Sequence, residues 1–343
     1  MTALVGRNGQ GKTSLLEAVY LLSTGRSFRT RRQDDLVSWE GGPARLDGNV
    51  EGRLGRQRLG LVIDGADRRL LINSAPVELD QFLGRLDVID LTMERMKVLR
   101  GEPEQRRRFL DRGLVGIDPT FLHVLGEYRR VLQQRNALLK RPGSGFAAQL
   151  EVWDERLAEV AAGVHARRRE YAIRLAATLG EVGRRVFHDD ADLVLRYRPS
   201  PAETREVEIA DFKELFVKAL ARGRERDATL GFTGVGPHRD DMKVELDGVD
   251  LRRFGSAGQV RGAMISLKFG KLELLHQARG ETPLLLMDDF DSDLDERRAS
   301  SVAGFLNEGG FQALVATSKE DMTDRLDVDF AKIRIHGGQA ETD

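Results

Sequence analysis

The chain has 343 residues, with 54 lysines and arginines against 55 aspartates and glutamates, which gives a formal net charge of −1. This length is enough for one large domain or two ordinary ones with a substantial core. The sequence is 41% apolar and 32% charged, which is typical of a folded, soluble chain rather than a disordered one. No apolar run reaches the roughly 18 residues of a bilayer span, so we expect no membrane association. Cysteine is absent, which excludes disulfides, thiolate nucleophiles and cysteine-ligated metals and fits a cytoplasmic location.

Charge is distributed unevenly along the chain. Positions 95–141 contain 12 basic and 5 acidic residues, whereas positions 281–343 contain 6 basic and 15 acidic residues. Most of the cations are arginines, whose planar charged group suits phosphate contacts. A coding bias gives the same excess of arginine, so this abundance alone does not identify a partner.

The first hundred residues indicate a mixed α/β segment. Residues 1–5 form an apolar run before a glycine-rich turn, and 12–23 carry leucine and valine at helical spacing. Residues 44–72 alternate weakly and turn at Asp64-Gly65, which predicts an antiparallel β segment. Residues 88–91 predict another strand.

A long helical region follows, from residue 102 to about 186. Pro103 suits the first turn of a helix. A second helix is predicted over 119–139 and a third over about 147–186, separated by the turn 142–145. Two long helices joined by a short turn form an antiparallel arm, and the longer one would reach about 60 Å at 1.5 Å per residue.

The mixed pattern returns after residue 190. Strands are predicted at 193–197, 242–246, 284–288 and 313–317, and helices at 256–277 and 295–306. Alternating strands and helices imply a parallel sheet. We therefore predict an α/β fold with a parallel core sheet, an antiparallel β segment and an inserted helical arm. The domain boundaries that we expect are 1–100, 101–230 and 231–343.

The first chemical motif is a complete phosphate loop with the pattern G-x-x-x-x-G-K-[ST]. Its glycines let backbone N–H groups surround a phosphate at the start of a helix. The lysine would reach the β- and γ-phosphates of a nucleotide, and the threonine hydroxyl would ligate Mg²⁺. The predicted nucleotide-binding residues are Gly6, Arg7, Asn8, Gly9, Gln10, Gly11, Lys12 and Thr13.

The second motif is an apolar strand, 284–287, that ends in the acids Asp288 and Asp289. Carboxylates at the carboxyl edge of a parallel sheet are where a phosphate-loop protein holds its magnesium. Asp288 would position Mg²⁺, and Asp289 would orient or deprotonate the attacking water. Apolar strands often end in aspartate, so the phosphate loop is what favours this interpretation.

The third motif, 256–261, begins with Ser256 at the start of a predicted helix. A serine cap followed by glycine forms a second anion cradle, although an ordinary capped helix has the same pattern. The chain already has one phosphate loop. A second segment that could bind a γ-phosphate therefore suggests a nucleotide site that is completed by another protomer. Residues 292–295 would line the same interface or cap a helix.

Two further clusters have two interpretations each. The arginines at 106–108, 129–130 and 167–169 lie on predicted helices, where they form a solvated face or contact the phosphates of DNA. The GPHRDD stretch at 236–241 places His238 beside Asp240 and Asp241. That cluster is interpreted as a structural turn held by ion pairs, with a metal site as the alternative.

Taken together, these motifs resemble the SMC-like ATP-binding-cassette ATPases, and most closely the RecF family of bacterial recombination-repair ATPases. The blocks that carry the resemblance are 6–30, RRRFLD (106–111), YRRVLQQRNALLK (128–140), VWDERLA (152–158), GPHRDD (236–241), SAGQVR (256–261) and MDDFDSDLDERR (287–298). By this resemblance Lys12 and Thr13 bind ATP-Mg²⁺, and Asp288 and Asp289 are the metal-binding and hydrolytic acids. Ser256, Gly258 and Gln259 form the signature that acts on the ATP of the partner protomer.

The resemblance implies ATP-driven dimerisation on single-stranded or gapped DNA, slow hydrolysis, a role in repair, replication and the SOS response, and partnership with RecO and RecR mediator proteins. Family members carry β strands ahead of the phosphate loop, whereas this chain has five residues there, so we expect part of the antiparallel sheet to be missing. The alternative functions are a transporter-type ATPase subunit and a phosphate-loop kinase that does not act on DNA.

Overall fold

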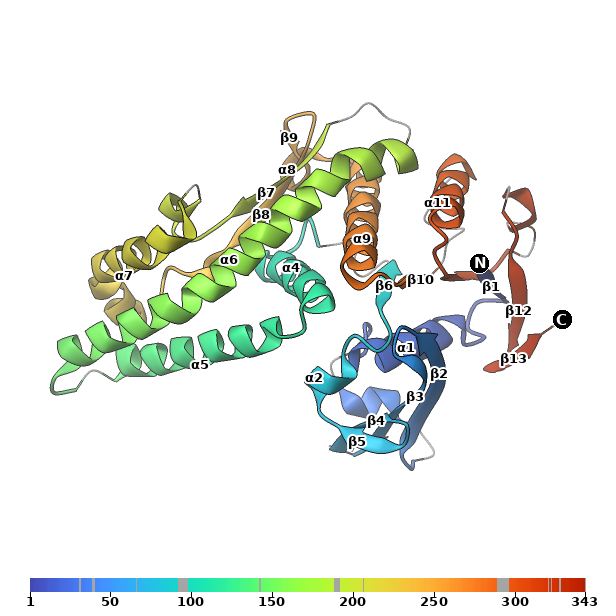
Figure 1. Ribbon diagram of the computed structural model, residues 1–343, viewed down its shortest axis with the longest axis horizontal. Coiled ribbons are helices and arrows are strands. Elements are labelled where there is room, and N and C mark those ends of the chain that lie inside the picture. The colour runs from blue at the N-terminus through green and yellow to red at the C-terminus, as the bar shows by residue number, and fades with distance from the viewer. Residues whose placement is uncertain are drawn as a thin grey trace. The chain divides into compact units, whose positions relative to one another are not determined.

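The computed structural model describes the chain apart from residues 31, 39–40, 66, 92–97, 142, 188–191, 206, 289–295, 320, 322, 327 and 343. The chain forms two compact units (Figure 1). The first unit contains residues 1–97, 181–191 and 261–343, and the second contains 98–180 and 192–260. Each unit is therefore assembled from segments that are far apart in the sequence.

The first unit is built around a six-stranded sheet with the order β13-β12-β1-β11-β10-β6. Neighbouring strands from β12 to β6 are parallel, and β13 runs antiparallel to β12. The strands are β1 (Thr2–Val5), β6 (Val88–Leu91), β10 (Leu284–Met287), β11 (Ala313–Thr317), β12 (Ala331–His336) and β13 (Gln339–Thr342). This sheet confirms the parallel α/β core, to which both ends of the sequence contribute.

Helix α1 (Lys12–Thr24) packs on this sheet through an apolar face. Leu16 and Tyr20, one turn apart, are buried together with Leu4 of β1 and Leu286 of β10. A fully buried leucine side chain contributes about 1.5–3 kcal/mol to stability. The helix ends at Gly25, whose φ of 65° closes the last turn. The core thus fixes the direction in which α1 leaves β1.

A second sheet of the same unit is antiparallel, with the order β2-β3-β4-β5. Its inward-facing side chains, including Leu59, Leu61 and Leu70, are buried with Leu21 and Leu22 of α1. The strands are β2 (Ala44–Gly52), β3 (Gly55–Asp64), β4 (Asp67–Ile72) and β5 (Ala75–Val77), followed by α2 (Leu79–Phe82). The antiparallel segment predicted over 44–72 is therefore confirmed.

Two further helices contribute to the first unit. They are α9 (Ala257–Arg279), whose first residues belong to the second unit, and α11 (Glu296–Glu308). A buried ion pair joins α9 to β6, because Lys268 Nζ donates to the Asp90 carbonyl oxygen at 2.7 Å and lies 3.5 Å from Asp90 Oδ1. Both side chains are almost inaccessible to solvent. This contact fixes α9 against the strand that neighbours β10.

Long helices dominate the second unit. They are α4 (Pro103–Ile117), α5 (Phe121–Lys140), α6 (Phe146–Phe187), whose last residues belong to the first unit, and α7 (Ile209–Leu230). A short helix, α8 (Leu251–Phe254), is also present. Helices α5 and α6 run antiparallel and side by side (Figure 1), with Arg156 of α6 paired to Glu127 of α5 and Arg135 of α5 paired to Asp154 of α6. The predicted arm is thus present, and the 42 residues of α6 span about 60 Å. Among the described residues, no helix is both long and apolar enough to cross a membrane.

The sheet of the second unit corrects one expectation. The strands predicted at 193–197 and 242–246 exist as β7 (Leu193–Arg198) and β8 (Asp241–Leu246). They pair antiparallel with each other and with β9 (Val249–Asp250) in a separate sheet, and do not extend the parallel one. Inward residues of β7 alternate with exposed ones, which is the pattern of a sheet with one solvated face.

A neutral histidine is buried in the helical packing of this unit. His165 of α6 is 1% exposed and stacks on Phe212 of α7, with ring centroids 4.3 Å apart. Burial, together with the nearby charges of Arg169 and Arg168, lowers the pKa of His165 to about 4. Within the described structure, its Nε2 atom has no hydrogen-bond partner. The ring is therefore neutral at pH 7 and acts as an aromatic packing group.

This burial makes the stability of the protein sensitive to acid. The unfolded chain takes up a proton at His165 below pH 6.5, whereas the folded chain resists protonation until about pH 4, so folding weakens as the pH falls through that window. His165→Phe should reduce the loss of unfolding free energy between pH 7.5 and pH 4.5 by about 2–3 kcal/mol. Urea unfolding followed by tryptophan fluorescence measures the difference. His123→Phe, at an exposed histidine of α5, is the control, and an equal effect of both variants would contradict the assignment.

Candidate functional site

The phosphate loop, residues 6–13, connects β1 to α1 in the first unit. Gly9 and Gly11 have φ values of 83° and 102°, a left-handed conformation that glycine adopts without steric cost. Helix α1 starts directly after Gly11, and no side chain of the described structure caps it. The N–H groups of its first turn have no acceptor within the helix. Arg7 and Asn8 of the loop are exposed, and the start of a helix is where backbone donors can bind an anion.

Lys12 lies across the inside of this loop. Its side chain is buried, and its Nζ atom donates hydrogen bonds to the carbonyl oxygens of Gly6 at 2.5 Å and Arg7 at 3.1 Å. Both acceptors are neutral, whereas a phosphate oxygen carries charge and forms the stronger bond to an ammonium group. The ammonium group is thus held in the loop, at the position where an anion would replace its carbonyl partners.

The loop is braced by the hairpin of β12 and β13, a contact that the sequence did not reveal. The side-chain Oε1 of Gln10 accepts from the N–H of Gly337 at 2.7 Å, and its backbone carbonyl accepts from the N–H of Gly338 at 3.0 Å. A Cβ atom on Gly6 would lie only 2.4 Å from the carbonyl oxygen of Ile335. Gly6 is therefore required by the close approach of β12, and Gln10 fixes the hairpin to the loop.

The predicted metal pair is brought together across 275 positions of sequence. The hydroxyl of Thr13 donates to Asp288 Oδ1 at 3.1 Å. Asp288 directly follows β10, and its N–H donates to the carbonyl of Leu91 on β6 at 3.4 Å. A hydroxyl and a carboxylate are both oxygen ligands of the kind that Mg²⁺ prefers. Asp289 and the segment 292–295 lie outside the described residues.

Glu17, a buried acid of α1, binds the segment that follows this helix. Glu17 is 7% exposed, accepts a hydrogen bond from the Ser27 hydroxyl and lies 3.4 Å from a guanidinium nitrogen of Arg29. It ties the segment that follows α1 back to the helix. The only sequence signal was an acid beside the buried stripe of Leu16 and Tyr20.

The signature segment caps α9 in the second unit. The Ser256 hydroxyl accepts from the N–H of Gln259 at 3.2 Å, and Gln259 Oε1 accepts from the N–H of Ser256 at 2.8 Å. This reciprocal pair is a capping box. Ser256 and Gln259 are exposed and Gly258 is half-buried, and the ring of Phe254, just before them, is 68% exposed. The segment therefore has the capped-helix geometry and an open, preformed helix start.

The arginine clusters have mostly internal partners. Arg106, Arg108, Arg167 and Arg168 form ion pairs, and Arg107 and Arg169 donate to backbone carbonyls. Arg129 and Arg130 on α5 are exposed, and the described structure gives them no ion-pair partner. Of the three arginine clusters considered for DNA contact, the pair on α5 is thus the one without an intramolecular ion-pair partner in the described structure.

The GPHRDD turn is held by ion pairs, as favoured from the sequence. Arg168, 3% exposed, binds Asp111 in a bidentate pair at 2.8 and 3.0 Å and contacts Asp240 Oδ2 at 3.0 Å. Burial raises the pKa of Asp240 to about 6, still below neutrality, and Arg168 opposes that rise. Arg106 binds Asp241 in the same bidentate manner, at 2.6 and 2.9 Å. These carboxylates are therefore committed to arginines.

The histidine of the turn is similarly engaged. His238 Nδ1 lies 2.6 Å from the hydroxyl of Tyr128, and its Nε2 lies 2.9 Å from the carbonyl oxygen of Thr233. Burial lowers the pKa of His238 to about 4. Among the described residues, no cluster of three histidine, aspartate or glutamate side chains is arranged to hold a metal ion.

Comparison with known proteins agrees with this geometry. The family described as RecF/RecN/SMC N terminal domain matches residues 1–339. The chain belongs to this family. A relative named DNA replication and repair protein RecF, from Myxococcus xanthus (strain DK1622), is 36% identical over 347 residues, which cover 98% of this chain and 90% of that protein. A protein of the same name from Geobacillus kaustophilus (strain HTA426) is 31% identical over 342 residues, covering 98% and 92%.

Two solved structures are similar to this chain. The structure described as the recombination mediator protein RecF-ATP in the RecFOR pathway matches with a TM-score of 0.88 and 30% identity, covering 99% of this chain and 91% of that one. An Smc head domain from Pyrococcus furiosus matches with a TM-score of 0.56 and 15% identity, covering 100% and 89%. The second likeness concerns the fold alone.

The buried arginines should carry much of the stability of the second unit. Arg168→Met leaves Asp111 and Asp240 buried without their shared cation, which should lower the free energy of unfolding by about 3–5 kcal/mol. Arg168→Lys keeps the charge but loses the planar fork, so an intermediate loss is expected. Arg130→Met, at an exposed site of α5, should change it by less than about 0.5 kcal/mol. Denaturant unfolding measures all three, and equal losses at positions 168 and 130 would contradict the role of burial.

Proposed function

We propose that the protein is an ATP-dependent DNA-binding protein of recombinational repair and replication, active in the SOS response and in the cytoplasm. ATP joins two protomers on single-stranded or gapped DNA, and slow hydrolysis releases them. RecO and RecR mediator proteins are the proposed partners. The names of the relatives and of the RecFOR-pathway structure support this proposal. The same proposal assigns the ATPase head to 1–100 and 231–343 and the arm to 101–230.

The observation that carries the proposal is the hydrogen bond between Thr13 and Asp288 at the mouth of the phosphate loop. It places a hydroxyl and a carboxylate beside the start of α1. Among the described residues, no side chain caps the backbone N–H groups at this helix start. These residues fit a nucleotide with Mg²⁺, which would neutralise charge on the β- and γ-phosphates. In this scheme Thr13 and Asp288 hold the ion.

The remaining roles follow from the chemistry of phosphoryl transfer, which needs positioning and charge neutralisation. The N–H groups of the loop and the ammonium of Lys12 bind the phosphates. Asp289 orients the attacking water. Ser256, Gly258 and Gln259 of a second protomer complete the site at the γ-phosphate, and the exposure of Ser256 and Gln259 is compatible with that contact.

We propose that DNA is bound through its backbone rather than through its bases. Aromatic residues make up 6% of the sequence, and the basic helices offer charge without clustered aromatic rings, which stacking on single strands requires. Contacts to phosphates release counterions, so affinity should fall steeply with salt. Within the arginine clusters of the helical unit, Arg130 is the candidate for such a contact.

Two substitutions separate nucleotide binding from metal binding. Lys12→Met removes the cation of the loop and should weaken ATP binding at least about tenfold with or without Mg²⁺. Asp288→Asn keeps an acceptor for Thr13 but removes the charge, so ATP should bind as in the wild type in EDTA and gain little when Mg²⁺ is added. Titration with a fluorescent ATP analogue under both conditions tests the assignment. An Asp288→Asn variant with normal Mg²⁺ dependence would show that the ion binds elsewhere.

A complementation experiment tests the shared site. Lys12→Met and Ser256→Arg should each abolish hydrolysis alone, because each disables one half of every composite site. In a mixed dimer, the loop of one protomer meets the signature of the other, so one of the two sites is intact. An equal mixture should recover roughly a quarter of the wild-type rate, as random pairing in a two-fold dimer predicts. Full activity of Ser256→Arg alone would instead favour a monomeric phosphate-loop kinase.

A further inference from the structure

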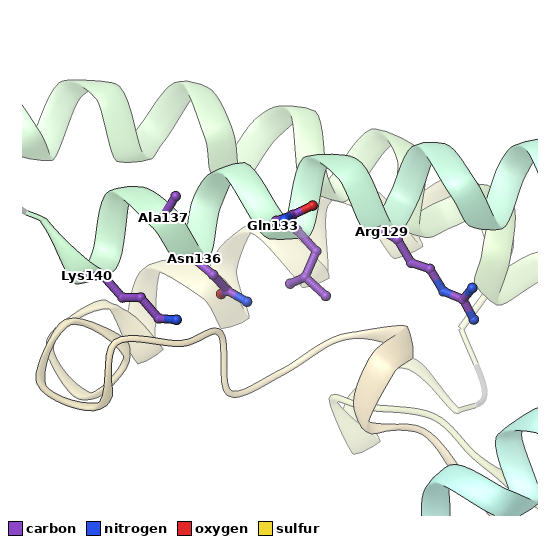
Figure 2. Close-up of a pocket in the computed structure, with 6 residues that line it drawn as sticks. Arg129, Gln133, Asn136, Ala137 and Lys140 are labelled. Atoms are coloured by element: carbon purple, nitrogen blue, oxygen red, sulfur yellow. The ribbon is translucent and has the colours of Figure 1, made fainter. Parts of the chain in front are cut away.

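An open hollow lies along one face of α5 in the second unit (Figure 2). Its volume is about 360 Å³, and it is lined by Arg129, Leu132, Gln133, Asn136, Ala137 and Lys140. The four polar residues follow one another at intervals of four, three and four positions, which places them on a single helix face. At 1.5 Å per residue, the two cations at its ends are about 16 Å apart along the axis.

The hollow is preformed, because a fixed segment runs along this face of α5. A Cβ atom on Gly231 would lie 3.3 Å from Cγ of Lys140, so the segment passes close to the end of the helix. Thr233 donates to Asn136 Oδ1 from its N–H at 2.8 Å and from its hydroxyl at 2.7 Å. Figure 2 shows the loop running beside the helix below Lys140 and Asn136. A ligand would therefore meet a surface that needs little rearrangement.

The polar side chains of the hollow are two cations, Arg129 and Lys140, and two amides, Gln133 and Asn136. The side-chain oxygen of Asn136 is occupied by the two bonds from Thr233, so the hydrogen-bonding group left to a ligand is its NH₂. The described structure contains no ion pair of Arg129 or Lys140. The other two basic side chains of α5 differ, because Arg135 is buried in ion pairs and Arg130 does not line the hollow. The surface is therefore complementary to an anion.

The apolar part of the lining indicates which anion. Leu132 and Ala137 lie between the terminal cations, and the bordering segment leaves Leu230 and Phe232 45% and 39% exposed. Apolar side chains between the phosphate contacts would not strengthen the binding of a nucleic-acid backbone. The cations and the apolar residues would both strengthen the binding of a peptide. Its carboxylates would pair with the cations, and an apolar side chain would pack between them.

We propose that this hollow binds an acidic peptide segment of a partner protein. An extended chain advances about 3.3 Å per residue, so two carboxylates five residues apart match the spacing of Arg129 and Lys140. An apolar residue between the two acids contacts Leu132. The site lies wholly within the second unit, so its occupancy does not depend on the proposed nucleotide function.

The test is a fluorescence-anisotropy titration of the full chain with the labelled peptide GSDGLFGDSG, whose aspartates are five residues apart. The wild-type protein should bind it, and exchange of both aspartates for lysine should abolish binding. Arg129→Gln combined with Lys140→Gln should weaken binding at least about tenfold. Asn136→Asp keeps the acceptor for Thr233 and places a carboxylate in the hollow, so a similar loss is expected.

Matched variants distinguish the hollow from general attraction to a basic helix. Arg130→Gln removes one cation next to Arg129 outside the lining and should leave binding within about twofold of the wild type. Lys12→Met should also leave it unchanged, which separates this test from that of the nucleotide site. The proposal is overturned if the peptide does not bind, if Arg130→Gln is as harmful as the lining variants, or if a twelve-residue oligothymidine binds the same face and displaces the peptide.

Discussion

The constraint on which the proposed chemistry depends is the strand order of the six-stranded sheet. β1 and β10 are separated in sequence by more than 270 residues, yet only β11 lies between them. Because the three strands are parallel, their carboxyl ends share one edge, and each places its following residue there. Thr13 and Asp288 meet at that edge. The helical region lies between Thr13 and Asp288 in the sequence as an insertion. The sheet, and not this insertion, therefore determines the geometry of the site.

Buried ion pairs join several of the sequence blocks that carry the family resemblance. RRRFLD binds GPHRDD directly through Arg106 and Asp241, and Arg168 of α6 pairs with an aspartate of each block. Arg135 joins the 128–140 block to Asp154 of the 152–158 block. Bidentate arginine pairs impose a fixed geometry on both partners. Such pairs specify how α4, α5 and α6 are arranged relative to the turn before β8. Their role is architectural, whereas Arg129 and Arg130 keep their charge for a ligand.

Features with a local signature could be predicted from the sequence. The phosphate loop, the acidic strand end, the antiparallel segment and the long helices all depend on neighbouring residues, and the structure contains them. Contacts between distant residues could not be predicted. No residue near Gln10 in the sequence indicates its hydrogen bonds to Gly337 and Gly338. Likewise, no residue near Lys268 indicates that it binds Asp90. The expectation that β7 and β8 extend the parallel sheet was wrong for the same reason, because the direction and partners of a strand are decided by distant residues.

The burial of these ion pairs has a practical consequence for work on nucleic-acid binding. Mobile ions screen charges that face water over roughly 8–10 Å at moderate ionic strength, but they screen enclosed pairs far less. Arg135, Arg106 and Arg168 are almost completely enclosed. Raising the sodium chloride concentration should thus dissociate a polyanion from the protein surface while the protein stays folded. A salt-induced release can then be interpreted as competition at the surface, without a parallel correction for denaturation.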